Sequence, residues 1–328
     1  MRRFLAALAI PLLAGAALAG CGSSSAKSAS TSSSSGPDTN ASVTASGLFG
    51  KAPSVTIPAS KASSDLKVKT LIQGTGAAIA SSDEFVGNYV VYTWDGTAHK
   101  QVGSTYATVP TLFTNPLLPG LQKAVVGQKV GSRILAVVPP KDGFGSTGNS
   151  QAGIKATTTL VFVIDVIKSY NGTDAAAGSQ VSSGGGNLPT VTAPKAAGQA
   201  PTVKMPASSV KPPTKLQVQT LVKGSGAKVG KGQYLIVQYT GYIWRTGNVF
   251  DASWSRKAPF GFQIGAGQVI PGWDNGLAGQ TVGSRVLLVI PPADGYGSAG
   301  ASQAGIKGTD TLVFVVDILD AYPASASS

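Results

Sequence analysis

Residues 282–319 read VGSRVLLVIPPADGYGSAGASQAGIKGTDTLVFVVDIL, and residues 130–167 read VGSRILAVVPPKDGFGSTGNSQAGIKATTTLVFVIDVI. The two stretches agree at most positions, and LIQGTGA (71–77) upstream of the first matches LVKGSGA (221–227) upstream of the second. The chain of 328 residues therefore contains one unit twice. Each unit spans roughly 110 residues, which predicts two independent domains, because solenoid units are shorter.

The strands expected in these units follow an alternating pattern. In TLVFVVDIL (311–319) and YLIVQYTG (234–241), every second residue is apolar. Alternate residues of a strand share one face, so this pattern predicts strands with one face toward a core. These faces comprise Leu312, Phe314, Val316 and Ile318 in the first segment, and Leu235, Val237 and Tyr239 in the second. Glycine- and proline-rich turns separate the apolar runs, as in an antiparallel sheet.

VIPGWDNGLAG (269–279) is the exception to the strand pattern. Pro271 can begin a short helix, since the missing N–H costs nothing at that position. Trp273 and Leu277 then share one face, and Gly279 can end the helix. The predicted fold class is α+β, with each domain a curved antiparallel sheet wrapped around one short helix.

The N-terminus predicts export. Arg2 and Arg3 precede an apolar run that ends in LAGC (18–21), so residues 1–20 are interpreted as a signal peptide. This arrangement resembles a bacterial lipoprotein signal, which implies lipidation of Cys21 and attachment of the exported protein to the membrane. An ordinary signal peptide with an incidental cysteine is the alternative.

Segments 21–60 and 171–212 are rich in Ser, Ala, Thr, Gly and Pro and contain too few large apolar residues to form a core of their own. We expect them to be a disordered tether and a disordered linker. The domains are then expected at 61–170 and 213–322.

Composition excludes several kinds of chemistry. One His and one Cys make a metal cluster or Cys/His catalysis improbable, so neither a metal nor a cofactor is expected. The net charge of +12 comes from scattered Lys and Arg, which predicts attraction to anionic surfaces rather than nucleic-acid binding.

The second unit resembles the FK506-binding-protein (FKBP) type of peptidyl-prolyl isomerase across residues 214–320. The motifs that carry this resemblance occur in the family's order and spacing: VQYTGY (237–242), VFDASW (249–254), PFGFQIG (259–265), VIPGWDNGLAG (269–279), VGSRVLLVIPP (282–292), GYG (295–297) and TLVFVVDIL (311–319). The fold of the family agrees with the sheet and short helix predicted above.

The resemblance also implies roles for individual residues. It implies an aromatic pocket of Tyr239, Phe250, Phe260, Trp273 and Phe314, with Trp273 as the floor for a proline ring. The other implied site residues are Val269 and Ile270 at the start of the helix, Tyr296 as a hydroxyl donor, Asp251 with its partner Arg256, and Ile306 in the loop after Tyr296. Taken singly, Tyr239, Phe262 and Phe314 also fit a plain core, and Asp251 fits a turn cap.

The first unit departs from this pattern at the positions that matter for activity. Aligned on the family pattern, Tyr92 takes the place of Tyr239, VGST (102–105) replaces FDAS, Leu121 replaces Trp273 and Phe144 replaces Tyr296. We expect a folded domain with weak or absent activity.

These interpretations predict a lipid-anchored envelope protein whose C-terminal domain isomerises X-Pro bonds in unfolded, exported polypeptides. The resemblance further implies macrolide ligands. A chaperone or adaptor whose domains only bind, and a purely structural envelope protein, are the alternatives.

Overall fold

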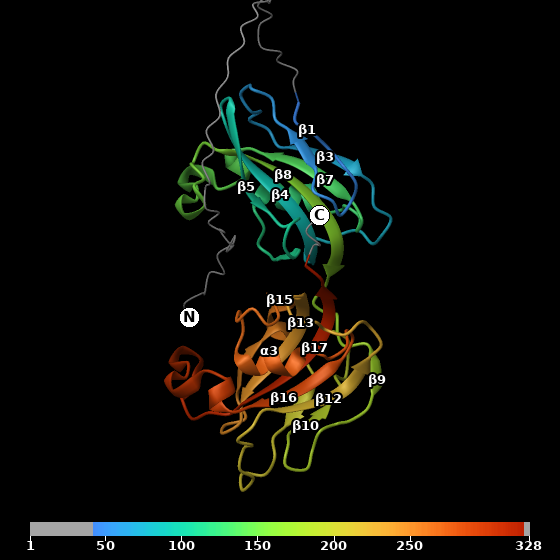
Figure 1. The fold of residues 1–328 in the computed structure, drawn as a ribbon, viewed down its shortest axis with the longest axis vertical. Coiled ribbons are helices and arrows are strands. Elements are labelled where there is room, and N and C mark those ends of the chain that lie inside the picture. Colours follow the sequence, from blue (N-terminus) through green and yellow to red (C-terminus); the bar gives the residue numbers. More distant parts are fainter. Residues whose placement is uncertain (1–41, 325–328) are drawn as a thin grey trace, which may run out of the picture.

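A computed structural model describes residues 42–324 and contains two large sheets whose strands are arranged alike, the second with β9 as an additional strand (Figure 1). The first sheet has the order β3-β7-β8-β4-β5, with β6 paired to β4, and the second has the order β14-β13-β17-β16-β12-β9, with β15 paired to β13. Neighbouring strands are antiparallel in both sheets. The predicted α+β class with two similar domains is confirmed.

The elements of the first domain are β3 (Lys67–Ile72), β4 (Glu84–Asp95), β5 (Ala98–Ser104), β6 (Thr111–Phe113), α1 (Pro119–Val125), β7 (Arg133–Val138), the 3-10 helices η1 (Pro140–Asp142), η2 (Gly145–Thr147) and η3 (Ser150–Ala152), and β8 (Thr159–Tyr170). Those of the second domain are β9 (Gly178–Gln180), β12 (Gln217–Gly224), β13 (Tyr234–Ile243), β14 (Val249–Ala252), α2 (Ser253–Arg256), β15 (Phe260–Gln263), α3 (Pro271–Leu277), β16 (Arg285–Ile290), the 3-10 helices η4 (Pro292–Asp294), η5 (Gly297–Ala299) and η6 (Ser302–Ala304), and β17 (Leu312–Tyr322).

The short helix α3 begins at Pro271, as predicted, and lies very close to the sheet. A Cβ atom added at Gly272 would lie 2.6 Å from Ile290 Cγ2, and one added at Gly276 would lie 2.6 Å from Leu288 Cδ2. The two glycines therefore allow the helix backbone to contact β16 directly. This close approach places Trp273 and Leu277 inside the core.

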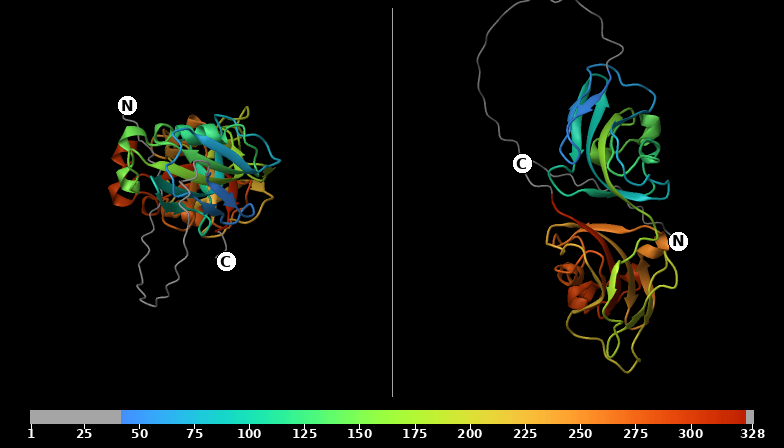
Figure 2. Two further views of the ribbon diagram at one scale, coloured as in Figure 1. Left: turned by 90° about the horizontal axis from the view of Figure 1, so that it is seen from above. Right: turned by 90° about the vertical axis from the view of Figure 1, so that its right-hand side faces the viewer.

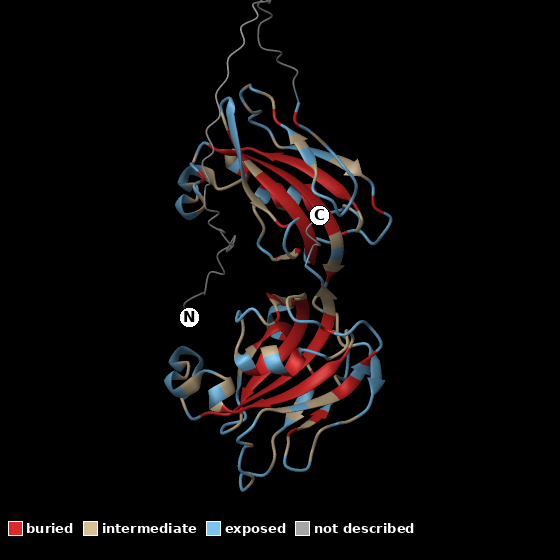
Figure 3. Cartoon of the chain, in the orientation of Figure 1, coloured by how far each residue is buried: buried red, intermediate tan, exposed pale blue. Residues whose placement is uncertain are grey.

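Both faces of each sheet are covered, and buried residues follow the central strands in both domains (Figure 3). The inner face of β17 contributes Leu312, Phe314, Val316 and Ile318 to the core under α3, as the alternation predicts. Its other face contributes Val313 and Val315 to a second cluster.

The second faces are covered by the segments for which disorder was expected. The hairpin of β1 (Thr44–Ser46) and β2 (Ser54–Thr56) precedes the first domain, and the hairpin of β10 (Thr190–Thr192) and β11 (Thr202–Lys204) precedes the second. Val43 and Ile57 cover the first sheet, whereas Val191 and Val203 cover the second. The prediction of disorder is therefore wrong for 42–60 and 171–212. A few apolar residues are enough to order such a segment when a folded sheet already offers an apolar face for them to pack against.

The segments that precede the sheets also complete two buried ion pairs. Arg133 Nε donates to Asp165 at 2.6 Å, and Gly50 N donates to the same carboxylate at 2.7 Å. In the second domain Arg285 and Asp317 form the equivalent pair, also at 2.6 Å, and Ala176 N donates to Asp317 at 2.9 Å. Buried charges are tolerated when such additional bonds satisfy them, so these segments belong to the folded domains.

Residues 1–20 with the predicted signal, Cys21, and the first part of the predicted tether lie outside the described residues. Within 42–324, no helix is long and apolar enough to cross a membrane. The two domains lie end to end, and the ends of β8 and β17 meet where they join (Figures 1 and 2).

Candidate functional site: an aromatic cluster around Trp273

The site is centred on Trp273 in the first turn of α3, where the side chain is 4% exposed. Three rings from three strands stand nearly perpendicular to the indole. The centroid distances and interplanar angles are 5.1 Å and 83° for Tyr239, 5.2 Å and 87° for Phe314, and 6.3 Å and 76° for Phe260. Edge-to-face contacts of this kind are favourable and orient each ring.

Two further rings complete the cluster. Phe250 on β14 contacts Phe314 edge-on at 5.5 Å, as the family resemblance implies. Phe262 was not among the predicted site residues, and its ring lies 5.5 Å from Trp273. The signal for Phe262 was present in the sequence: the alternation of a strand places Phe260 and Phe262 on one face and Gly261 on the other.

A polar group borders the aromatic cluster. Asp251 on β14 accepts hydrogen bonds from the hydroxyl of Tyr239 and from Nη1 of Arg256. Arg256 Nη2 also donates to the Tyr239 hydroxyl, at 3.0 Å. Burial and the bond to Asp251 raise the pKa of Tyr239, so the phenol stays protonated at neutral pH. Both oxygens of Asp251 are therefore engaged within the protein.

Two donors near the cluster are not engaged by the described residues. Tyr296 lies at the start of η5 and is 41% exposed, and its hydroxyl forms no hydrogen bond within residues 42–324. Burial raises its pKa, with a smaller contribution from the charge of Asp251, so this hydroxyl remains a donor. The backbone N–H of Ile270, at the start of α3, likewise donates to no other group in the described part of the chain.

The remaining predicted residues also contact the cluster. Val269 and Ile270 are partly buried and pack against the core that contains Trp273. Ile306 follows η6, is 3% exposed, and belongs to the same core. The structure thus brings together every predicted site residue of the second domain, whereas the role of each remains a prediction.

The expected equivalence of Tyr92 and Tyr239 is wrong. Tyr89, not Tyr92, stands at the position of Tyr239, because its N–H donates to Thr105 Oγ1 at 2.9 Å as the Tyr239 N–H donates to Ser253 Oγ at 2.8 Å. Residues 89 and 92 are three apart and therefore face opposite sides of β4. Tyr92 packs against the outer cluster under the β1–β2 hairpin.

The other substitutions in the first domain are as predicted. Gly103 pairs with Val91 where Asp251 pairs with Gly241, so the tyrosine of the first domain has no carboxylate opposite it. Leu121 occupies the place of Trp273 in α1, and Phe144 precedes η2 as Tyr296 precedes η5. The fold is retained while the polar groups and the indole are lost.

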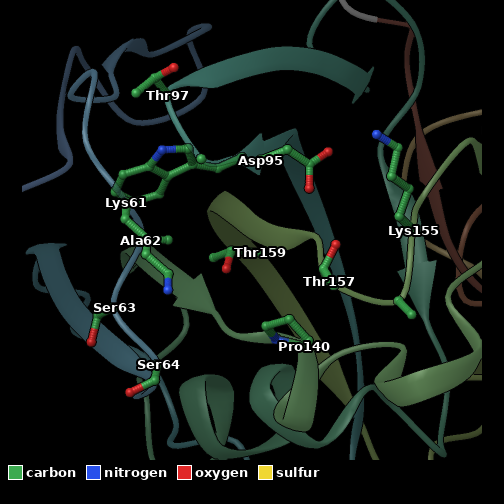
Figure 4. A pocket seen from close by; sticks show the side chains of 13 residues that line it. Lys61, Ala62, Ser63, Ser64, Asp95, Thr97, Pro140, Lys155, Thr157 and Thr159 are labelled. Atoms are coloured by element: carbon green, nitrogen blue, oxygen red, sulfur yellow. The ribbon is translucent and has the colours of Figure 1, made fainter.

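The first domain also has an open cavity away from its central helix. It is lined by Lys61, Trp94, Asp95 and Lys155 among others, between the β4–β5 turn and the start of β8 (Figure 4). None of the residues equivalent to the Trp273 site lines it. Among the described residues, no group of His, Cys, Asp and Glu is arranged to hold a metal ion.

Comparisons with known proteins identify the family of the chain. The family model "FKBP-type peptidyl-prolyl cis-trans isomerase" matches residues 76–167 and 225–319. An FK506-binding protein of Streptomyces anulatus is 44% identical over 109 residues, which are 33% of this chain and 88% of that protein. An FK506-binding protein of Neisseria meningitidis serogroup A is 39% identical over 107 residues, 33% of this chain and 96% of that protein. The solved structure of FkpA from Escherichia coli is 38% identical, covers 34% of this chain and 51% of that one, and has a TM-score of 0.31.

The chain therefore belongs to the FKBP-type peptidyl-prolyl cis-trans isomerase family, with two family domains in tandem.

Proposed function

We propose that the second domain catalyses cis–trans isomerisation of X-Pro bonds by binding the twisted amide above Trp273. Rotation about a peptide C–N bond has a barrier of about 18–20 kcal/mol, since the bond has partial double-bond character. X-Pro bonds populate both isomers but exchange slowly without a catalyst. No covalent step is needed to accelerate this exchange.

Differential binding is the basis of the proposed mechanism. The twisted amide has lost its resonance, so its carbonyl is less polar and leaves water at a lower cost than the planar form. An apolar, aromatic site therefore favours the twisted form, and only such a preference lowers the barrier. Each ~1.4 kcal/mol of preference gives a tenfold increase in rate.

The observation that carries the proposal is the pair of unengaged donors beside an aromatic cluster. The Ile270 N–H can donate to the carbonyl on one side of the rotating bond, and the Tyr296 hydroxyl can donate to the carbonyl on the other side. Asp251 and Arg256 hold the Tyr239 ring in place and transfer no proton in this mechanism.

The test is a protease-coupled prolyl-peptide assay of the chain. We expect a rate above background, and we expect its loss in the double variant Trp273→Leu/Tyr296→Phe, which copies the first domain. A folded wild-type protein with no rate above background would favour the alternative function, a chaperone or adaptor that only binds.

We further propose that the first domain has no isomerase activity of its own. Gly103, Leu121 and Phe144 stand in place of the carboxylate, the indole and the hydroxyl of the second domain. Activity that remains in the double variant and does not fall further when Asp251→Ala is added in the second domain would come from the first domain and contradict this assignment.

The location and the partners are part of the same proposal. The signal-like residues 1–20 and Cys21 support a lipid-anchored protein that acts on exported, unfolded polypeptides, and the relatives named for FK506 support binding of macrolides. Cys21→Ser is expected to release the protein from membranes in a fractionation experiment. Persistent membrane association of that variant would argue against lipidation.

A further inference from the structure

The two domains contact each other through the ends of their sheets. Lys168 Nζ and Asp320 form an ion pair at 2.6 Å, and the Tyr170 hydroxyl donates to the same carboxylate at 2.8 Å. The hydroxyls of Tyr170 and Tyr322 also share a hydrogen bond. Tyr170 and Tyr322 are the last residues of equivalent strands, so matching ends of the two copies face each other, as in an isologous dimer interface.

An apolar cluster, which we term the interdomain patch, lies beside these polar contacts. Val86, Tyr170, Ile236 and Leu319 are buried in it, and Leu112, Ile167, Tyr234 and Tyr322 pack around them. Each domain contributes half of these residues. The combination of apolar burial and hydrogen bonds favours a fixed arrangement of the two domains.

The interface reaches the strand that carries Phe260. Leu112 N, on β6, donates to the Tyr234 hydroxyl at 3.3 Å. The ring of Tyr234 lies against Gly261, where an added Cβ atom would be 2.5 Å from the Tyr234 hydroxyl oxygen. Gly261 lies between Phe260 and Phe262, so Tyr234 supports the back of β15 while the first domain holds Tyr234.

A second contact lies beside Arg256. A Cβ atom added at Gly172, two residues after β8, would lie 2.7 Å from Lys257 Cβ, so the backbone of the segment that leaves the first domain packs directly on Lys257. Lys257 ends α2 in the left-handed region, at a φ of 54°, which is uncommon for a residue other than glycine. The surroundings thus hold this residue in one conformation, immediately after the arginine that binds Asp251.

A buried carboxylate of the first domain is also affected by the charge of this arginine. Glu84 is 4% exposed, and its Oε2 has no hydrogen-bond partner in the described structure. Burial raises the pKa of Glu84 to about 7, while a bond from the Asn115 backbone and the positive charge of Arg256 act in the opposite direction. Arg256 is therefore within the electrostatic reach of Glu84 across the interface.

We propose that the first domain positions the segment 253–263 of the second domain, through Leu112 on β6 and through the chain that leaves β8 at Gly172, and so holds Arg256 and Phe260 in the geometry of the site. The inference rests on the proposed isomerase function for its kinetic readout. Leu112 and Gly172 contact no group that would touch the substrate, so they are positioning residues. Small misplacements of the groups around a reacting bond are costly, which gives the first domain a role without any activity of its own.

The test opens the interface in the full chain. Lys168→Glu places two negative charges at the contact with Asp320, and Leu112→Arg is added to place a charge in the interdomain patch. X-ray scattering reports the separation of the domains, and hydrogen exchange reports the mobility of 253–263. Two matched variants serve as controls. Lys141→Glu reverses a surface pair with Asp65 inside the first domain, and Lys168→Glu/Asp320→Lys restores an ion pair at the interface.

In the opened variant we expect kcat/KM to fall about tenfold and exchange in 253–263 to rise, with an unchanged unfolding midpoint for the second domain. The swapped pair, which keeps Leu112, is expected to show wild-type values of both quantities. An opened chain with wild-type kcat/KM and wild-type exchange would overturn the proposal, as would an equal loss in Lys141→Glu. A wild-type chain without isomerase activity would instead contradict the proposed function. Hydrogen exchange of residues 253–263, compared between the wild type and the opened variant, would still show whether the first domain positions this segment.

Discussion

Removal of the Tyr296 hydroxyl separates catalysis from stability more cleanly than any other single change. Tyr296 is 41% exposed and its hydroxyl has no partner within the described residues, so Tyr296→Phe removes no bond that stabilises the fold. We expect the unfolding midpoint of the variant to match that of the wild type. Any effect on the rate then reports contact with the substrate.

The expected size of that effect follows from one hydrogen bond. A neutral hydrogen bond contributes about 0.5–1.5 kcal/mol, and ~1.4 kcal/mol corresponds to a tenfold change in rate. We therefore expect kcat/KM for a prolyl peptide to fall by about two- to twelvefold. The assay is the protease-coupled measurement on the full chain, with thermal unfolding recorded on the same samples.

The first domain supplies the matched control for this experiment. Phe144 occupies the place of Tyr296, so Phe144→Tyr adds the same hydroxyl to a domain that lacks the indole and the carboxylate. We expect no gain in activity from it. The reasoning is refuted if Tyr296→Phe retains the wild-type kcat/KM, or if its unfolding midpoint falls in step with its rate.

Three further outcomes are expected. Trp273→Leu is expected to lower the free energy of unfolding of the second domain by about 2–3 kcal/mol in urea denaturation. The same variant is expected to lose binding of a prolyl peptide. An unchanged peptide affinity would contradict the proposed role of the indole as the floor for the proline ring. Gly272→Ala is expected to destabilise the same domain by about 1–3 kcal/mol, because its Cβ would lie 2.6 Å from Ile290, and a neutral effect in denaturation would show that the helix can move away from the sheet. Burial raises the pKa of Glu84 from 4.5 to about 7, so the free energy of unfolding is expected to fall by roughly 3 kcal/mol as the pH rises from below 4.5 to above 7. Denaturation at pH 4, 6 and 8 is expected to show this loss in the wild type and not in Glu84→Gln. An equal loss in both proteins would contradict the raised pKa of Glu84.

The sequence alone was sufficient for the local features of this protein. Alternation predicted which residues of β17 face the core, Pro271 predicted where α3 begins, and the repeat predicted two domains of one fold. These features depend on the period of a strand or helix and on local backbone preferences, which neighbouring residues determine.

The features that the sequence did not predict depend on register and on surfaces that exist only after folding. Tyr89 rather than Tyr92 faces the core because strand pairing sets the register of β4, and a shift reverses the faces. The hairpins at 42–60 and 171–212 become ordered because each sheet offers an apolar outer face to a segment that could build no core by itself. The hydrogen bond from Leu112 N to the Tyr234 hydroxyl likewise requires both folded domains, because it joins residues more than a hundred positions apart in the chain.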